Sequence, residues 1–235
     1  MTPPVLEIAD LVKGYHGLRP LRVQSLVVQP GEALAILGLD AVGAEVLINL
    51  LTGAMLPDTG EVRVFGQSTA AIADSDAWLG VVDRFGLVSA RAVLLESLSV
   101  VQNLAMPFSL DIEPPSAALR ERAVALATEV GLAEGGWDRP VGSLDAEGKL
   151  RVRLGRAVAL EPAILVLEHP SDGLDRARVV EVGRHIRAVA GARQMTALTL
   201  TADAEFAQHA ASRVLTFEPA SGKLVPRRRR WLFGK

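Results

Sequence analysis

The chain has 235 residues, 49% of them hydrophobic, and a formal net charge of −2. This length suits one large α/β domain or two small ones, and the hydrophobic content favours a folded core over disorder. The near-neutral charge gives no overall signal for nucleic-acid binding, and the lack of cysteine excludes disulfides and thiolate chemistry.

The first third of the chain predicts an order of strand, loop, helix and strand. Strand-like composition or alternation is found in residues 5–11, 21–28, 33–37 and 61–65. The third of these segments is an apolar run that ends at Gly38, as a buried strand that leads into a loop would. After Gly43 the apolar residues recur at helical spacing, and Gly53 offers a stop.

The rest of the chain predicts helices that alternate with strands. Helical spacing is found in residues 116–130, 150–160 and 177–189, and buried strands are expected at residues 163–167 and 196–201. The alternation of the two types favours a mostly parallel α/β sheet.

The joints between these segments resemble the nucleotide-binding subunits of ATP-binding cassette (ABC) transporters. Residues 37–53 resemble the Walker A strand, loop and helix of that family, and residues 57–66 resemble the strand pair that follows it. Residues 151–175 resemble the signature helix, the Walker B strand and the D-loop in sequence. The order and spacing of these pieces match the family over about residues 5–224.

The resemblance implies a fold and a domain organisation. The fold is a P-loop NTPase-type α/β fold with a mostly parallel sheet flanked by helices, an N-terminal antiparallel β subdomain and an inserted helical subdomain. The ABC ATPase-like domain would cover residues 1–225, with the helical subdomain at about residues 85–155. A basic and aromatic tail would follow at residues 226–235.

The phosphate-binding loop has lost its charged and hydroxyl side chains. A P-loop reads G-x-x-x-x-G-K-[ST], in which backbone amides and lysine bind phosphate and the hydroxyl holds Mg²⁺. Gly38 and Gly43 are kept here, but Ala44, Glu45 and Val46 stand at the lysine, hydroxyl and following positions. Two unit charges about 4 Å apart interact by roughly 4 kcal/mol at an effective dielectric of 20, so Glu45 would repel a phosphate. Glu45 could instead be an internal anion at the helix N-terminus, which is the interpretation that we favour.

The Walker B strand ends in residues that also depart from the family. An aspartate that orients Mg²⁺ and a glutamate that polarises water are expected there, and Glu168 and His169 stand in their places. An imidazole can act as a base near neutral pH. We favour a non-catalytic His169, because no phosphate site accompanies it.

Three further motifs are altered. We expect Arg84 at the Q-loop glutamine position and Ala202 at the H-loop histidine position. The L-S-G-G-Q signature reads Leu144, Asp145, Ala146, Glu147 and Gly148. Tyr15 stands where a side chain would stack on adenine, or is a residue of the core or surface.

The losses concentrate on phosphate and water chemistry, while positions that form the fold are kept. The kept positions are Gly38, Gly43, Gly53, Gly60, Pro162, Pro170, Leu174 and Asp175. ABC subunits dimerise head-to-tail, and each ATP lies between the Walker motifs of one subunit and the signature of the other. The altered Walker residues of this chain would therefore impair one composite site, and its altered signature would impair the other, even beside an intact partner.

The sequence thus favours a catalytically degenerate subunit, a pseudo-ATPase with a structural, assembly or regulatory role in a membrane transport complex. The alternatives are an active or weakly active transport ATPase and a soluble regulator with an ABC fold. No cofactor is expected, and ATP and Mg²⁺ would bind only if nucleotide binding persists. No catalytic or metal-ligating residue is assigned.

The expected partners are an ABC transporter membrane subunit, through about residues 84–108, and a second ATPase subunit in a homodimer or heterodimer, with no nucleic acid. The first ten residues lack a signal-peptide pattern, and no apolar run reaches the roughly 18 residues of a membrane span. We therefore expect a cytoplasmic protein that lies peripherally at the inner face of a membrane. Contact with an anionic membrane surface is one interpretation of the tail, and a solvated charge run is the other. The tail residues concerned are Arg227, Arg228, Arg229, Arg230 and Trp231.

Overall fold

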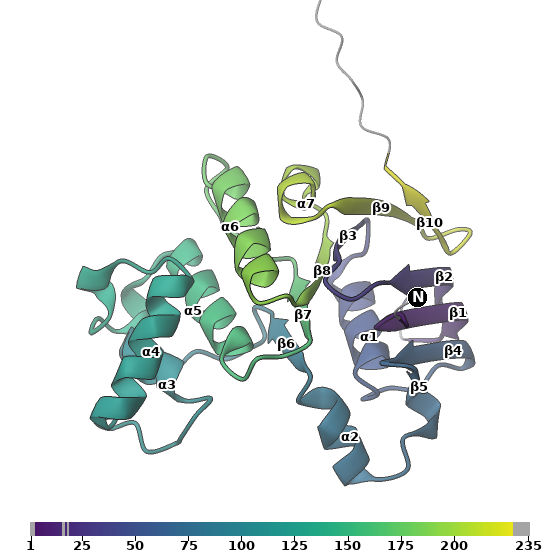
Figure 1. Ribbon diagram of the computed structural model, residues 1–235. Coiled ribbons are helices and arrows are strands. Elements are labelled where there is room, and N and C mark those ends of the chain that lie inside the picture. Colours follow the sequence, from purple (N-terminus) through teal and green to yellow (C-terminus); the bar gives the residue numbers. More distant parts are fainter. Residues whose placement is uncertain (1–2, 16, 18, 228–235) are drawn as a thin grey trace, which may run out of the picture.

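A computed structural model describes residues 3–15, 17 and 19–227 of the chain. Two β-sheets and their helices form an elongated body, with the antiparallel sheet at one end and a helical region at the other (Figure 1). The mostly parallel sheet, the antiparallel β subdomain and the inserted helices that were predicted are all present.

The central sheet has six strands in the order β10-β9-β3-β8-β7-β6. Their bounds are β3 Ala33–Leu37, β6 Phe85–Val88, β7 Ile164–Glu168, β8 Thr196–Thr201, β9 Arg213–Glu218 and β10 Lys223–Pro226. All neighbours are parallel except β10, which is antiparallel to β9. The near-continuous apolar runs of β3 and β7 fit strands that are covered on both faces.

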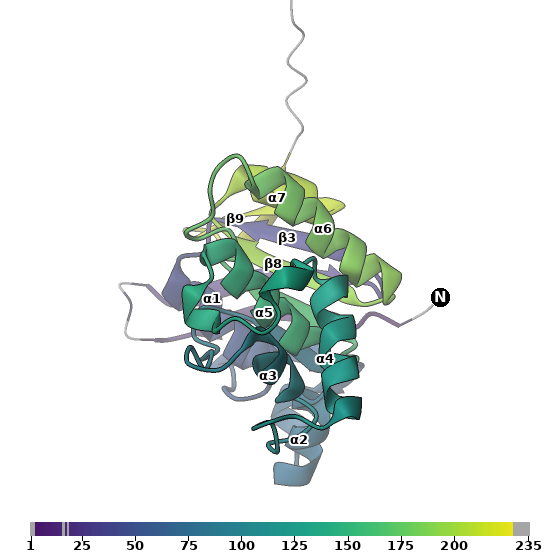
Figure 2. The ribbon, with the colours of Figure 1, turned by 90° about the vertical axis from the view of Figure 1, so that its left-hand side faces the viewer.

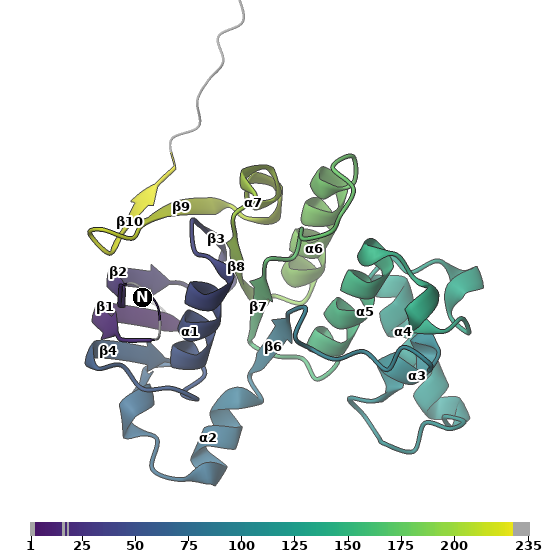
Figure 3. The same cartoon turned by 180° about the vertical axis from the view of Figure 1, so that it is seen from behind.

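The second sheet is antiparallel and has the order β2-β1-β4-β5. Its strands are β1 Leu6–Lys13, β2 Leu21–Val28, β4 Thr59–Val64 and β5 Gln67–Ser68. Helix α1 (Ala41–Leu51) lies between the two sheets, as Figure 3 shows from behind. Seven of its eleven residues are buried, and six of these share one apolar cluster with side chains of both sheets.

Most other helices cover the opposite face of the central sheet or extend beyond its edge. Helices α6 (Val179–Ala192) and α7 (Ala204–Ala210) pack on that face, and α2 (Ser75–Val82) leads into β6. The helical region consists of α3 (Val100–Ala105), α4 (Ala117–Glu129) and α5 (Ala146–Val158), which stand together in Figure 2. One apolar cluster runs from β6 and β7 into these three helices, so the helical region packs directly on the sheet.

Several element bounds differ from the prediction. Helix α1 begins at Ala41 rather than after Gly43, and α5 begins at Ala146 rather than at residue 150. Both helices start early because an aspartate directly before them caps their first turn. Short elements that carry little periodicity were not predicted, namely α2, α3, α7, β5, β6, β9 and β10.

The end of the chain also differs in part from the prediction. Pro226 belongs to β10, and the backbone N–H of Arg227 donates to the carbonyl of Val214, so these two residues extend the sheet. The other tail residues, Arg228, Arg229, Arg230 and Trp231, lie outside the described residues. The division into an ABC ATPase-like domain and a tail stays a prediction. Within the described part of the chain, no helix has the length and apolar character needed to cross a membrane.

Candidate functional site

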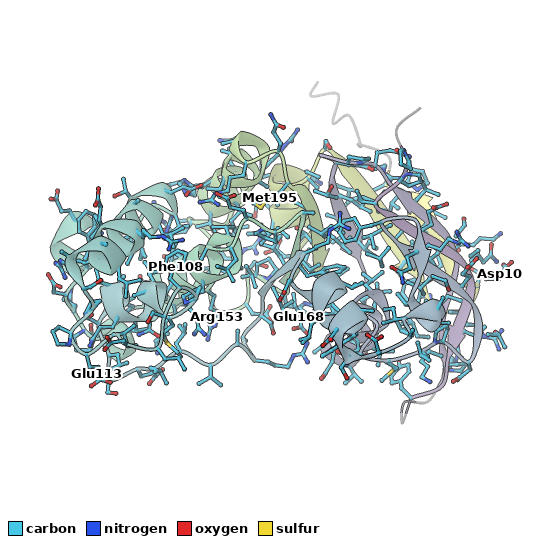
Figure 4. The ribbon with its side chains drawn as sticks, turned by 60° about the horizontal axis from the view of Figure 1, so that its bottom comes forward. Asp10, Phe108, Glu113, Arg153, Glu168 and Met195 are labelled. Carbon is cyan, nitrogen blue, oxygen red and sulfur yellow. The ribbon has the colours of Figure 1, made fainter. Side chains whose placement is uncertain are left out.

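The carboxyl ends of the parallel strands bring the altered motifs to one edge of the central sheet. Ligands of open α/β sheets bind at this edge. Gly38 follows β3, Glu168 ends β7, Ala202 follows β8 and Ser89 follows β6. Figure 4 labels Glu168 near the middle of the molecule, and Arg153 on the side toward the helical region.

The segment that corresponds to the phosphate-binding loop is short and closed. Only three residues, Gly38, Leu39 and Asp40, connect β3 to α1. The side chain of Leu39 is buried in the cluster around α1, with 3% exposure. The Asp40 carboxylate accepts a hydrogen bond from the Gly43 amide at 2.7 Å, and the Asp40 carbonyl accepts one from the Ala44 amide at 2.9 Å. Two amides that a P-loop would turn toward phosphate are therefore satisfied by the chain itself.

The internal anion at this helix N-terminus is Asp40, and our prediction of Glu45 for that role is wrong. Glu45 lies one turn into the helix, and its half-exposed side chain pairs instead with Arg91, at 2.5 Å between Oε1 and Nη1. The neighbouring Ala44 and Val46 are buried, with 0% and 5% exposure. The lysine position of the family and the position after the hydroxyl thus face the core in this chain.

Arg91 joins two carboxylates across the edge. Its Nη2 atom lies 2.9 Å and its Nε atom 3.2 Å from Oε2 of Glu168, while its Nη1 atom contacts Glu45. The Ser89 hydroxyl also donates to Oε2 of Glu168, at 2.5 Å. The Glu168 side chain is only 9% exposed, so these donors satisfy a mostly buried carboxylate.

The structure places Arg84 at the opposite end of β6 from this site. Arg84 precedes the strand, and its guanidinium lies 3.2 Å from the ring centroid of Phe65. Burial lowers the pKa of the Arg84 guanidinium. Ser89, Ala90 and Arg91 directly follow β6 at the carboxyl edge of the sheet. This segment therefore lies where we predicted the Q-loop residue Arg84. The strand register decides this point, because Val88 pairs with Leu167, next to Glu168.

His169 and Ala202 lie at the same edge, and neither side chain makes a hydrogen bond to another described residue. The His169 backbone is left-handed, with φ 42°, and its N–H donates to the Leu200 carbonyl at 2.8 Å. Its Nε2 atom is buried and meets no hydrogen-bond partner among the described residues. Ala202 is exposed and has no side-chain donor or acceptor.

The signature-like residues form a second closed helix N-terminus. The Asp145 carboxylate accepts a hydrogen bond from the Gly148 amide at 2.8 Å and caps α5. Glu147 pairs with Arg178 and with Arg151, each at 2.8 Å. The hydrogen bond from Arg178, helped by that from Arg151, lowers the pKa of Glu147 to about 2. Leu144 and Ala146, beside them, are half-buried.

Tyr15 follows β1 and packs, half-buried, against the apolar cluster that contains α1. This contact suits a residue of the core margin, and its predicted contact with adenine stays a prediction.

The residues at the edge do not fit a nucleotide and its metal ion. The Gly43 and Ala44 amides are engaged by Asp40, the lysine position is a buried alanine, and the two carboxylates that could approach a metal both pair with Arg91. In the part of the chain that the structure describes, no group of three or more His, Cys, Asp or Glu side chains is arranged to hold a metal ion.

Comparison with known proteins agrees with this architecture. The family model described as ABC transporter matches residues 21–172. The methionine import ATP-binding protein MetN of Brucella abortus (strain 2308) is 27% identical over 215 residues, which cover 92% of this chain and 58% of that protein. The sulfate/thiosulfate import ATP-binding protein CysA of Methylococcus capsulatus is 29% identical over 217 residues, covering 89% and 59%. The chain thus spans less than two thirds of the length of these relatives.

Solved structures share the fold. The structure of cbiO1 from Clostridium perfringens, described as part of the ABC transporter complex cbiONQ, superposes with a TM-score of 0.78 at 21% identity. It covers 95% of this chain and 87% of that one. The dimeric structure of MJ0796, a bacterial ABC transporter cassette, gives a TM-score of 0.73 at 20% identity and covers 93% and 96%.

Proposed function

The chain belongs to the ABC transporter family, and on this premise we propose that it is a catalytically degenerate ATP-binding-type subunit. Such a pseudo-ATPase would have a structural, assembly or regulatory role in a membrane transport complex. It would lie in the cytoplasm at the inner face of a membrane, bound to a membrane subunit and to a second ATPase subunit.

The observation that carries this proposal is the cap that Asp40 forms on α1. A helix N-terminus is an anion site because its first amides lack partners within the helix. Here the Gly43 amide donates to the Asp40 carboxylate and the Ala44 amide to the Asp40 carbonyl. A phosphate group would have to displace a covalently attached carboxylate, and no lysine would compensate its charge.

Titration of the purified chain with Mg-ATP tests the proposal. We expect no measurable binding, because the amides are engaged and Ala44 supplies no cation. A dissociation constant in the low micromolar range, by calorimetry, would favour the alternative of an active or weakly active transport ATPase. A steady release of phosphate from Mg-ATP would establish that alternative.

A groove of about 480 Å³ supports the membrane subunit as a partner. It lies beside β6 and α5, and its lining includes Leu87, Met106, Leu110 and Leu160, with Arg153 and Arg156 at its margin. Leu110 and Leu160 are 85% and 63% exposed, which is unusual for leucine. An apolar segment with acidic residues would complement this lining.

Recovery from detergent-solubilised membranes tests this partner. We expect the wild-type chain to retain an integral membrane protein, and the Leu110→Asp variant to lose it. Leu56→Asp is the matched control, because Leu56 is also exposed, at 48%, and does not line the groove. Failure of the wild-type chain to retain any membrane protein would favour the soluble regulator.

The basic tail supports a second contact, with an anionic membrane surface. Basic residues near such a surface contribute about 1 kcal/mol each. Removal of residues 228–235 should weaken binding to vesicles that contain phosphatidylserine at low salt. Equal binding of the shortened and full-length chains would favour the alternative, in which the tail is a solvated charge run.

A further inference from the structure

We propose that Arg91 is a tethered cation that stands in the position of the metal ion and fastens the loop after β6 to the sheet edge. This inference rests on the proposed loss of nucleotide chemistry and names what has replaced it. Asp40 then substitutes for a phosphate group and Arg91 for the metal, both permanently.

The position of Arg91 follows from the two side chains that it joins. In P-loop NTPases the metal ion is held by the hydroxyl residue of the P-loop and by the Walker B aspartate. Glu45 and Glu168 occupy these two positions in this chain, and one guanidinium contacts both of their carboxylates. The planar fork of arginine suits such a bridge, because its nitrogens can bind different carboxylates at the same time.

The burial of Glu168 separates this pair from an ordinary surface salt bridge. Exposed ion pairs contribute little, but a mostly buried carboxylate is costly without a partner. Glu168 ends a central strand with 9% side-chain exposure, and Arg91 is the only cation paired with it in the described part of the chain. Arg91 is therefore the counter-ion of a carboxylate that the fold places in the interior.

The loop that carries Arg91 is held from a second side by α5. The Ser89 hydroxyl donates to Glu168 and accepts from the Arg91 amide at 3.1 Å. On the other side, Arg153 Nε donates to the Ala92 carbonyl at 3.2 Å, and Arg156 Nη1 donates to the Val93 carbonyl at 2.6 Å. Residues 89–93 thus link the sheet edge to the helical region.

The Arg91→Ala variant tests this assignment with Mn²⁺ alone as the probe. Removal of the Arg91 guanidinium leaves the oxygens of Glu45, Glu168 and Ser89 without their shared cation. Hard oxygen ligands of this kind bind Mn²⁺. We expect Mn²⁺ to bind this variant at least about tenfold more tightly than the wild-type chain, measured by calorimetry or by electron paramagnetic resonance. The double variant Arg91→Ala with Glu45→Gln should lose that gain.

Hydrogen–deuterium exchange gives a second readout. The amides of residues 89–95 should exchange faster in Arg91→Ala than in the wild-type chain, and Mn²⁺ should slow them again. Arg120→Ala is the matched control, because Arg120 is 45% exposed against 43% for Arg91 and pairs with Asp138 at the surface. Its exchange in residues 89–95 and its Mn²⁺ affinity should equal those of the wild-type chain.

Arg91→Gln keeps a polar side chain, though a shorter and uncharged one, and serves if Arg91→Ala does not fold. Equal Mn²⁺ affinity of the wild-type chain and these variants, or unchanged exchange in residues 89–95, would overturn the inference. Neither result depends on ATP, whereas the proposed pseudo-ATPase fails only if the wild-type chain binds or hydrolyses ATP. The two failures are thus distinct.

Discussion

The N-termini of α1 and α5 have the same aspartate N-cap in two different surroundings. At each, an aspartate directly before the helix accepts a hydrogen bond from the amide three residues later, at 2.7 Å for Asp40 and 2.8 Å for Asp145. In this family these termini belong to the Walker A and signature motifs, which face phosphate. A carboxylate engages one amide at each terminus, so restoration of one motif would leave the cap of the other in place.

The surroundings of the two caps differ in burial and in charge. The hydrogen bond between the Gly43 amide and the Asp40 carboxylate is half-buried, and the preceding residue, Leu39, is buried. Helix α1 itself lies in the core between two sheets. The bond of Asp145 is exposed, and its neighbour Glu147 is held by two arginines. The comparison teaches that the same capping hydrogen bond forms in either setting, while its effect on stability depends on what the helix packs against.

Restoration of the Walker A residues should have the largest effect on ligand binding. We expect the triple change Ala44→Lys, Glu45→Ser and Val46→Thr to restore ATP binding at most weakly, because Asp40 still engages the Gly43 amide. Addition of Asp40→Gly should tighten Mg-ATP binding by at least about tenfold over the triple variant, by calorimetry. Neither variant should hydrolyse ATP, since His169, Ala202 and Asp145 leave the transition state unsupported.

The matched control adds Asp145→Gly to the triple change instead of Asp40→Gly. This variant should bind ATP no better than the triple variant, because it removes the cap of α5 and leaves the Asp40 cap of α1 in place. Circular dichroism must show that each variant is folded, since Ala44→Lys places a cation at a buried position. Equal affinities with and without Asp40 would contradict the role that we assign to its carboxylate.

Removal of the α1 cap should lower the stability of the whole chain. Loss of an N-cap aspartate costs about 1 kcal/mol, with a range of roughly 0.5 to 2. We expect Asp40→Ala to lie near the upper end, because the bond is half-buried and α1 joins two sheets. Urea unfolding measures the change, and Asp40→Ser should recover most of it, since serine also caps helices.

Removal of the α5 cap should have a smaller effect. Asp145→Ala loses an exposed hydrogen bond, so we expect about 0.5 kcal/mol, the lower end of the same range. The comparison would be broken if Asp145→Ala destabilised the chain as much as Asp40→Ala in the same urea experiment.

The smallest expected effect is a pH dependence at α5. Because Arg178 and Arg151 lower the pKa of Glu147 from 4.5 to about 2, its ionised form stabilises the folded chain above pH 4.5. This contribution should decline as the pH falls from about 4.5 to about 2. Glu147→Gln should therefore destabilise the chain near pH 6 and approach the wild-type stability toward pH 2. Urea midpoints across this range measure the difference, and a difference that stays constant with pH would contradict the assignment.

The sequence by itself determined the fold and the residue types that stand at the Walker A, Walker B and signature positions. Residues 21–28, 33–37 and 196–201 are strands with the predicted bounds, because apolar runs between turn residues leave little choice. The family resemblance rested on positions such as Gly38 and Pro162, whose backbone roles are local. The alanine at the lysine position of the P-loop could likewise be identified without any structure.

Only the tertiary structure decided which charged groups meet. The sequence offered Glu45 as the anion at α1, but the helix starts at Ala41, so Asp40, next to the buried Leu39, is its cap. Arg91 had no sequence signal, because its partner Glu168 is 77 residues away and the order of strands brings them together. Capping depends on where a helix starts, and an ion pair depends on strand order and register. The cap of α1 joins residues only three positions apart, whereas the ion pair of Arg91 and Glu168 is set by packing over the whole domain rather than by the residues on either side.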